Sequence, residues 1–507
     1  MKLQSILSVL LLSCMLLFAC SDDKYTTNDP NANLDAPSYS DVNDRYQTYH
    51  TFWKPNGGWV GDPMPFYENG KYHVVYLHDA RDGAPTFHPF AMATTTDFIT
   101  YEDNGIIIPC GEEGSQENAL GTGCVYKFKD TYYAFYTAHN RELNPPEKIF
   151  LATSEDLITW TKQPEFSMQA ESGYDANDFR DPFVFKEGDE YKMLITTRGY
   201  IKEVDDWQAV IAQYKSKDMI NWELDDPFYF NGERMLECPD TFIMGDYQYL
   251  IYSNWGWDGN PDRKVHYRYR KVGTSEWIVP EQPRLDDIEF YAGKTAGEGN
   301  ERFIMGWCPT REDFNDDSNY NWAGSLVVHQ LTQNEDGTLN VQAPNPLIEK
   351  LNKKDLKMVY NQDGKKEGTN NYSLNSGTDD AFILFDREKG LFGVTASIQL
   401  NTAKQFGFEF GSGGNRSEVH RLVFDTELNQ LRLEKKTNDE VTIRTNRSIN
   451  LDLESIDITL LVENSVCVIY VNNELALSCR IYQMNYNPWG IFSKDGTVQF
   501  NNVSLIK

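Results

Sequence analysis

The chain has 507 residues, with 76 acidic and 47 basic side chains and a formal net charge of −29. This charge argues against nucleic acid as a partner, because phosphate binding depends on a basic surface, and it favours a neutral substrate over a sugar phosphate. The length exceeds one ordinary core, so at least two domains are expected. An aromatic content of 13%, with abundant Gly, Asn and Asp, favours many short strands joined by turns. We therefore expect an all-β protein.

The first residues have the pattern of a processing signal. Met1-Lys2 forms a short positive region, and Ile6 to Phe18 form an apolar stretch too short for a convincing membrane span. Leu17-Phe18-Ala19-Cys20 resembles a lipoprotein cleavage box, which would make Cys20 the lipidated first residue of the mature protein. The alternative is a plain secretory signal with an incidental Cys. We expect residues 1–20 to be a lipoprotein signal peptide.

Residues 21–42 are predicted to be a flexible tether. They begin with Ser21-Asp22-Asp23-Lys24 and contain too little apolar surface to fold. The acidic residues directly after Cys20 resemble the export signal that sends Bacteroidetes lipoproteins to the cell surface. We therefore expect an outer-membrane or cell-surface lipoprotein, facing outward or toward the periplasm, that contacts the membrane only through its lipid anchor.

Five segments share one pattern of strand, polar turn and strand, at intervals of roughly 50 to 60 residues. They read DPMPFYENGKYHVVYLHD from Asp62, GCVYKFKDTYYAFYTAHN from Gly123, DPFVFKEGDEYKMLITTRG from Asp181, CPDTFIMGDYQYLIYSNWG from Cys238 and YAGKTAGEGNERFIMGW from Tyr291. An offset repeat, TTDFITYED, SEDLITWTK and SKDMINWEL, places Asp97, Asp156 and Asp218 in one frame. Repeats of this length indicate stacked supersecondary units of about four strands each. We predict a five-bladed β-propeller over residues 43–345.

Three acidic residues stand at the start of the first strand in their repeats. In a propeller this strand lines the central channel, so residues at its start converge near the axis. Asp62 and Asp181 hold equivalent positions in the first and third repeats, and Glu237 precedes the strand of the fourth. Asp before Pro is also ordinary turn chemistry, but this alternative would make the repetition a coincidence. We expect the three carboxylates to share one pocket.

From Lys353 onward the pattern changes to short alternating strands, such as AFILFDR, GVTASIQLN, QFGFEFGSG and ITLLVENSVCVIYVNN. This spacing is typical of a β-sandwich. The segment has no comparable cluster of acids at strand starts. We predict that residues 353–507 form a β-sandwich beside the propeller that supports it or positions the substrate.

Six of the eight cysteines lie beyond the predicted signal peptide, and they show no CxxC spacing and no neighbouring His cluster. This pattern supports neither a zinc site nor a redox motif. We expect small buried apolar side chains, although an oxidising compartment would permit a disulfide. The six are Cys110, Cys124, Cys238, Cys308, Cys467 and Cys479.

The acidic motifs resemble those of glycoside hydrolase family 32, the invertase, levanase and inulinase group. Residues 59–65, WVGDPMP, are similar to its Trp-x-Asn-Asp-Pro-Asn-Gly motif; residues 179–182, FRDP, match its Arg-Asp-Pro motif; and residues 237–240, ECPD, match its Glu-Cys motif. Weaker similarities are LGTG from Leu120, FYAGKTA before RFIMGW, NWAGSLVVHQL, and VIYVNNELALSCRIY in the predicted sandwich. The order and spacing of the three acidic motifs make the resemblance specific.

The resemblance implies a retaining glycosidase that cleaves β-fructofuranosides such as levan, inulin or sucrose. It implies that Asp62 is the nucleophile, Glu237 the general acid/base and Asp181 the transition-state stabiliser. This chemistry requires no metal or cofactor. Crowding raises the proton affinity of the least solvated carboxyl, so we expect Glu237 to stay protonated near neutral pH while the aspartates stay charged. The expected substrate-binding residues are Trp59, His78, Thr122, Arg180, Tyr291 and Trp307.

The sequence departs from the family pattern beside the nucleophile. Gly61 and Met64 replace the two Asn residues of the motif, Pro65 replaces its Gly, and Leu77 stands where many members have Gln. Each lost hydrogen bond to a buried hydroxyl costs about 1 to 3 kcal/mol, unless residues such as His78, Asp79 or His88 take over. Two alternatives to fructan hydrolysis therefore remain open, namely hydrolysis of another furanoside and a non-catalytic glycan-binding lipoprotein.

Overall fold

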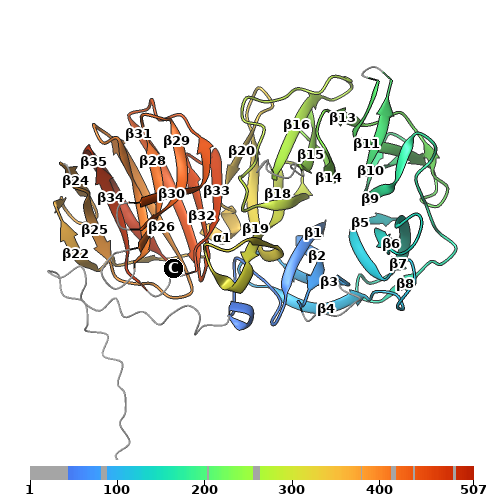
Figure 1. The fold of residues 1–507 in the computed structure, drawn as a ribbon, viewed down its shortest axis with the longest axis horizontal. Helices are drawn as coiled ribbons and strands as arrows, with labels where there is room; N and C mark the ends of the chain where they lie inside the picture. The colour runs from blue at the N-terminus through green and yellow to red at the C-terminus, as the bar shows by residue number, and fades with distance from the viewer. Residues whose placement is uncertain are drawn as a thin grey trace, which may run out of the picture.

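The computed structural model describes residues 44–81, 88–202, 205–254, 263–377, 379–412, 418–437, 440–482 and 487–507. The predicted signal peptide, the tether and Cys20 lie outside the described residues. Strands dominate the described chain and form two lobes that lie side by side (Figure 1). Within these ranges no helix has the length and apolar character needed to cross a membrane.

The first lobe contains η2 (Asp44–Tyr46), β1 (Trp59–Glu68), β2 (Lys71–Asp79), β3 (Phe90–Thr95), β4 (Glu102–Ile108), β5 (Ala119–Phe128), β6 (Thr131–His139), β7 (Glu147–Ser154), β8 (Trp160–Lys162), β9 (Tyr174–Glu187), β10 (Glu190–Ile201), β11 (Asp206–Ser216), β12 (Glu223–Leu224), β13 (Tyr229–Asn231), β14 (Leu236–Met244), β15 (Tyr247–Asn254), β16 (Lys264–Lys271), β17 (Tyr291–Glu298), β18 (Glu301–Arg311), η3 (Glu312–Phe314), β19 (Tyr320–Gln333) and β20 (Leu339–Gln342).

The second lobe follows the short helix α1 (Asn345–Ile348) and contains β21 (Lys353–Lys354), β22 (Met358–Gln362), β23 (Gly364–Lys366), β24 (Tyr372–Ser376), β25 (Ala381–Phe385), β26 (Leu391–Leu400), β27 (Gln405–Ser412), β28 (Glu418–Asp425), β29 (Gln430–Thr437), β30 (Glu440–Ser448), β31 (Ser455–Glu463), β32 (Val466–Val471), β33 (Leu475–Arg480), β34 (Trp489–Lys494) and β35 (Gly496–Ile506).

All five predicted repeats are antiparallel hairpins, formed by β1–β2, β5–β6, β9–β10, β14–β15 and β17–β18. Further strands extend three of them into the sheets β5-β6-β7-β8, β12-β11-β10-β9 and β14-β15-β16. The fifth hairpin and β19 join β1–β4 in one sheet through the pair Val60 and Gly324, which connects the end of the lobe to its beginning. The sheets surround a common centre (Figure 1). This arrangement confirms the propeller, whereas the count of five blades stays a prediction.

The high aromatic content follows from the burial of inner strands on both faces. In β2, Tyr72, Val74 and Tyr76 pack into the core shared with β18 and β19, and Val75 and Leu77 pack into the core shared with the next sheet. A sheet that is covered on both sides needs large apolar side chains at consecutive positions. Neighbouring sheets of the propeller are thus held together by continuous apolar layers.

The offset repeat has a structural role in capping a turn. In each copy an Asp carboxylate accepts hydrogen bonds from backbone N–H groups that follow it, at 2.8 Å from Thr100 to Asp97, 2.6 Å from Thr159 to Asp156 and 2.8 Å from Asn221 to Asp218. Bonds from amides favour the charged form of a carboxyl, and they lower the pKa of Asp156 and Asp218 to about 2. The repeated Asp therefore caps the same turn in all three copies.

The second lobe consists of two facing sheets, β23-β24-β35-β26-β31-β32-β33 and β22-β25-β34-β27-β28-β29-β30. Inward side chains of both sheets form a continuous apolar core that includes Phe406, Phe408, Ile458 and Phe500. Two packed antiparallel sheets with interdigitating side chains define a sandwich. The predicted β-sandwich is confirmed.

Buried polar contacts join the two lobes. The guanidinium of Arg480, in the sandwich, donates to the backbone oxygen of Cys308 at 3.0 Å. Asp286, in the propeller, accepts a hydrogen bond from the Ser478 hydroxyl at 2.6 Å and pairs with His329 at 3.0 Å. These groups are buried, and buried polar groups are stable only when they are partnered. The sandwich therefore supports the side of the propeller that carries Cys308 and Asp286.

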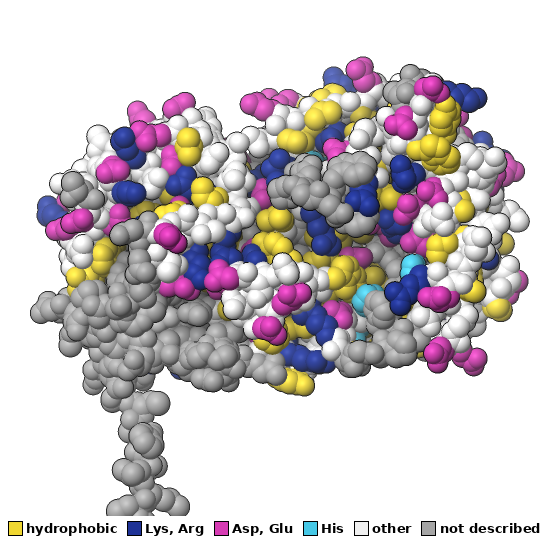
Figure 2. Space-filling model, viewed as in Figure 1, with side chains coloured by type: hydrophobic (Ala, Val, Ile, Leu, Met, Phe, Trp, Pro, Cys, Tyr) yellow, Lys and Arg dark blue, Asp and Glu magenta, His cyan; other side chains and the backbone are white. Residues whose placement is uncertain are grey.

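Within the described residues Cys124, Cys238, Cys308, Cys467 and Cys479 are free thiols. Cys110 is partly exposed and the other five are buried, as expected for small apolar side chains. On the face shown in Figure 2, acidic and basic side chains are interspersed over both lobes, and His side chains lie beside a hollow in the propeller.

Candidate active site

The inner strand of every repeat is interrupted by a β-bulge at the same place. The pairing shifts in β1 between Gly61 and Met64, and equivalent shifts occur in β5, β9, β14 and β17. A bulge leaves a residue outside the ladder and re-aims its side chain. Asp62 and Asp181 occupy two of these bulges with φ of 34° and 57°. Pro suits the next position because the ladder is already broken there and needs no N–H. The Asp-Pro pairs are therefore bulges within strands, not turns.

Equivalent positions on the five inner strands meet around one centre. Asp62, Thr122, Asp181, Cys238 and Ala292 occupy the bulges. Thr122 Oγ1 donates to Asp62 Oδ2 at 2.7 Å, and the backbone N–H of Cys238 donates to Asp181 Oδ2 at 2.9 Å. Cys238 Sγ lies 4.0 Å from Thr122 Oγ1. Residues more than a hundred positions apart are thus in direct contact.

Asp62 is held by one donor on each carboxylate oxygen. Besides the bond from Thr122 to Oδ2, Trp307 Nε1 donates to Oδ1 at 2.9 Å. Burial raises the pKa of Asp62, and these two hydrogen bonds oppose the rise. Their effect is to fix the carboxylate in one orientation and to favour its charged form.

Glu237 contacts two other side chains across the site. Tyr291 donates its hydroxyl proton to Oε2 at 2.6 Å, and Arg180 Nη2 lies 3.3 Å from Oε1. Arg180 is in turn fixed by Glu147, at 3.1 Å, and by Asp178, at 2.7 Å. Burial alone would lower the pKa of Arg180, but the surrounding carboxylates hold it well above its ordinary value. Glu237 therefore faces a permanent positive charge.

Asp181 is the most enclosed of the three acids. The residue is 4% exposed, whereas the side chain of Glu237 is 21% exposed. Burial raises the pKa of Asp181 to about 7, with Arg180 opposing the rise and Glu237 adding to it. The expectation that Glu237 is the least solvated member is therefore wrong, because Asp181 is enclosed between the neighbouring strands and contacts the Cys238 N–H and Thr196. The raised pKa of Asp181 also runs against the expectation that both aspartates stay fully charged near neutral pH.

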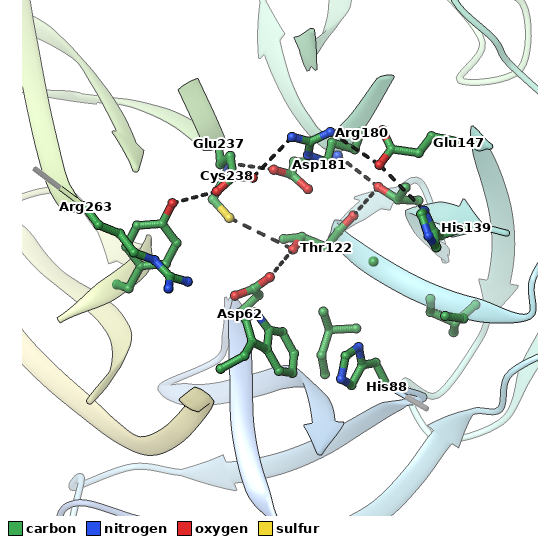
Figure 3. Close-up of a pocket in the computed structure, with 17 residues that line it drawn as sticks. Asp62, His88, Thr122, His139, Glu147, Arg180, Asp181, Glu237, Cys238 and Arg263 are labelled. Atoms are coloured by element: carbon green, nitrogen blue, oxygen red, sulfur yellow. Dashed lines mark hydrogen bonds and ion pairs between the residues drawn. The ribbon is translucent and has the colours of Figure 1, made fainter. Parts of the chain in front are cut away.

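These groups border one cavity of about 400 Å³, a size typical of small-molecule sites. Asp62, Asp181 and Glu237 face this space from three different strands (Figure 3). Its lining consists of Asp62, Leu77, His88, Ala119, Leu120, Gly121, Thr122, Thr137, His139, Glu147, Arg180, Asp181, Glu237, Cys238, Arg263, Tyr291 and Trp322. The three predicted carboxylates thus share a single pocket.

The predicted substrate-binding residues fall into three groups in the structure. Thr122, Arg180 and Tyr291 line the pocket. Trp307 is buried beside it and reaches Asp62 through its indole N–H. Trp59 and His78 are not among the lining residues.

Strand geometry explains the two exceptions. Successive side chains of a strand point to opposite faces, so Leu77 faces the pocket and His78 lies against Gly58. Trp59 is 1% exposed and packs under the guanidinium of Arg81 at 5.1 Å. Of the three residues considered as replacements for the lost polar groups, His88 lines the pocket, while Asp79 is paired with Arg81 at 2.9 Å.

Sequence reasoning missed six lining residues: Ala119, Thr137, His139, Glu147, Arg263 and Trp322. Trp322 lies within NWAGSLVVHQL, and a large aromatic in a family-like motif was a signal that could have found it. Glu147 had no such signal, since it reaches the site only because β7 pairs with β6. Asp240, next to the acidic motif, is 1% exposed and accepts a bond from the backbone N–H of Thr295, so its role is structural.

The departures from the family pattern have two different outcomes. Met64 is 2% exposed, and its sulfur accepts the N–H of Gly123 at 3.0 Å, so it joins two neighbouring strands of the ring instead of facing the pocket. Gly61 lies directly under the ring of Trp322. Within the described ranges no group of three or more His, Cys, Asp or Glu side chains has the arrangement of a metal site.

Comparisons with known proteins agree with this geometry. The model of the glycosyl hydrolases family 32 N-terminal domain matches residues 52–344, and that of a GH32, BT1760-like, C-terminal domain matches residues 337–505. The raffinose invertase of Escherichia coli is 25% identical over 86% of this chain and 89% of its own length. The sucrose-6-phosphate hydrolase of Staphylococcus xylosus is 24% identical over 86% of this chain and 87% of its own length.

Solved structures share the fold. A β-fructofuranosidase of Bombyx mori superimposes with a TM-score of 0.68 at 19% identity, covering 92% of this chain and 95% of that one. Fructan 1-exohydrolase IIa of Cichorium intybus superimposes with a TM-score of 0.69 at 16% identity, covering 92% of this chain and 97% of that one. The chain belongs to glycoside hydrolase family 32, and it is a glycoside hydrolase that cleaves β-fructofuranosidic bonds.

Proposed function

We propose that the chain cleaves fructans or fructosyl oligosaccharides by a retaining mechanism, with Asp62 as nucleophile, Glu237 as general acid/base and Asp181 as transition-state stabiliser. One observation carries this proposal: Asp62 and Glu237 border the same cavity but are held by different donors. Two carboxyl groups in different environments can take different protonation states, as acid and nucleophile must.

In the first step Glu237 transfers its proton to the glycosidic oxygen while a charged Asp62 oxygen attacks the anomeric carbon. The bond to the leaving sugar breaks, and a fructosyl–Asp62 ester forms. Thr122 and Trp307 keep the attacking carboxylate oriented, at 2.7 and 2.9 Å. In the second step Glu237, now charged, removes a proton from water, which attacks the same carbon and releases Asp62.

Arg180 and Tyr291 position Glu237. Tyr291 donates to one of its oxygens, and Arg180, anchored by Glu147, lies beside the other. The guanidinium of Arg180 therefore lies beside the carboxylate that Glu237 becomes after proton transfer. Asp181 lies next to Arg180 and accepts the N–H of Cys238. From there its carboxyl binds ring hydroxyls and balances the positive charge that develops on the furanosyl ring.

The preferred substrate is a neutral fructan chain or fructosyl oligosaccharide. The net charge of −29 disfavours anionic sugars, although some relatives are named sucrose-6-phosphate hydrolases. A relative in Bacillus subtilis, 21% identical over 64% of this chain and 65% of its own length, is named a levanbiose-producing levanase. Polymeric substrate also suits the predicted location, a surface lipoprotein anchored through Cys20.

The test measures release of reducing sugar from levan, inulin, sucrose and sucrose 6-phosphate by the wild type and by Asp62→Asn. We expect fructan or fructosyl oligosaccharide to be hydrolysed, and the variant to lose about 10³-fold or more of kcat. Wild-type binding of fructan without hydrolysis would instead favour a binding protein. Activity only on another furanoside, such as an arabinofuranoside, would change the donor sugar but not the roles of the acids. Labelling of Cys20 with a fatty-acid analogue in cells tests the anchor.

A further inference from the structure

Gly61 has no room for a side chain because Trp322 fills the space above it. A Cβ atom built on Gly61 would lie 2.2 Å from Cη2 of Trp322 and within 2.8 Å of two further ring carbons. Real Cβ contacts are longer than 3.0 Å, so any larger residue must move the indole ring. Position 61 directly precedes Asp62, so the six-membered ring of Trp322 reaches the immediate neighbour of the proposed nucleophile.

Trp322 is held in this place by its backbone. The guanidinium of Arg81 donates to the carbonyl oxygens of Trp322, at 2.8 Å, and Ala323, at 3.2 Å, while pairing with Asp79 at 2.9 Å. Ala323 adopts φ of 63°, a left-handed conformation that costs free energy outside glycine. The pairing of β18 with β19 is also interrupted here. A strained and tethered backbone indicates that the position of the indole ring is specifically maintained.

The neighbours of Trp322 make this side of the pocket weakly polar. His88 packs against the ring with centroids 4.1 Å apart, and Leu77 also lines the wall. Burial lowers the pKa of His88 to about 3, and His139 and His78 add to the effect, so the imidazole is neutral at physiological pH. Arg180, Glu147, Asp181 and Glu237 lie across the pocket from His88 (Figure 3). The pocket thus has one aromatic wall and one charged wall.

We propose that Gly61 and Trp322 are a size-matched pair that sets the width of the pocket beside Asp62, with Trp322 as the stacking surface for the fructosyl ring that Asp62 attacks. This inference rests on the proposed function of the pocket. The pair explains the absence of a polar side chain at position 61, since the aromatic ring occupies its space. Sugar C–H groups pack well on an aromatic face, and Leu77 and His88 extend that face.

The pair predicts an interaction between two substitutions. In Gly61→Ala the new methyl group must displace the indole ring, which narrows or distorts the space above Asp62. Misplacement of about 1 Å at a reacting centre can cost about 100-fold in rate. Trp322→Phe removes the ring atoms that meet the new methyl group, so the double variant Gly61→Ala/Trp322→Phe regains the room that the single variant lost.

The experiment measures kcat and KM on fructan for the wild type, both single variants and the double variant. We expect kcat/KM to fall about 10- to 100-fold in Gly61→Ala and less in Trp322→Phe, chiefly through KM. The double variant should exceed Gly61→Ala and approach Trp322→Phe. Gly232→Ala is the matched control, because a Cβ there meets no atom within 4 Å, and it should equal the wild type.

Two outcomes overturn the inference: wild-type kcat/KM in Gly61→Ala, or a double variant whose loss equals the product of the single losses, as for independent sites. Because Trp322→Phe adds no volume to the interior, this variant is also used for a second measurement, of tryptophan fluorescence. In an Asp62→Asn background, fructan should change tryptophan fluorescence, and Trp322→Phe should remove most of that change; an unchanged signal contradicts stacking. Full activity of Asp62→Asn would refute the proposed function itself, which separates the two failures.

Discussion

Replacing Trp307 by Phe tests how the proposed nucleophile is kept charged. The substitution removes the donor that lies 2.9 Å from Asp62 Oδ1 and leaves Thr122 as the remaining side-chain donor. A hydrogen bond to a charged group contributes about 1.5 to 3 kcal/mol. At 1.36 kcal/mol per unit, this loss corresponds to a rise of roughly 1 to 2 units in the pKa of Asp62. Burial already raises that pKa, so the variant should lose activity over a range of pH that the wild type tolerates.

The assay is the pH dependence of kcat/KM on fructan. We expect the acidic limb of Trp307→Phe to move upward by about 1 to 2 pH units, with activity partly recovered at higher pH. Trp489→Phe is the matched control, because Trp489 is equally buried but lies in the sandwich core. Trp489→Phe should lower the melting temperature without moving the acidic limb of the kcat/KM profile. An unchanged acidic limb in Trp307→Phe would refute the view that this bond controls the charge of Asp62.

Three further predictions follow from the same network and its surroundings. Burial raises the pKa of Asp181 to about 7, so this carboxyl contributes stability while it is protonated, and the contribution is lost as pH rises toward 7. The melting temperature of Asp181→Asn, relative to that of the wild type, should therefore be higher at pH 7.5 than at pH 4.5. An equal difference in melting temperature at both pH values would contradict the cause given. Glu147→Gln removes the carboxylate that pairs with Arg180 at 3.1 Å, so Arg180 should lose its fixed position beside Glu237 and kcat/KM should fall; an unchanged kcat/KM would contradict a positioning role for Glu147. Asp218→Ala removes a cap that accepts two backbone N–H groups, so the melting temperature should fall while kcat/KM stays at the wild-type value, and a loss of activity would count against a purely structural role.

The sequence predicted the fold because its signals are local and repeated. Strand, polar turn and strand recur five times, and each copy forms the expected hairpin. Alternation after Lys353 likewise predicted the sandwich. The meeting of Asp62, Asp181 and Glu237 was also predictable, since equivalent positions of repeats around an axis must come together.

Other features of the site were not predictable from the sequence. Glu147 follows no motif and reaches Arg180 only because β7 lies beside β6 in the folded sheet. His78 was expected in the pocket, but the strand turns it away and presents Leu77. Glu237 was expected to be the least solvated of the three acids, but Asp181 is more deeply buried. Burial depends on how the neighbouring strands pack around each carboxyl and not on the residue type.

The sequence by itself determined the repeat, the identity of the acids and the order in which they come along the chain, since these properties are carried by neighbouring residues. Only the tertiary structure decided which acid is most deeply buried, which donors hold Asp62 and why position 61 is Gly. These properties depend on contacts between residues as distant as Gly61 and Trp322, and such contacts exist only when the ring of sheets has closed.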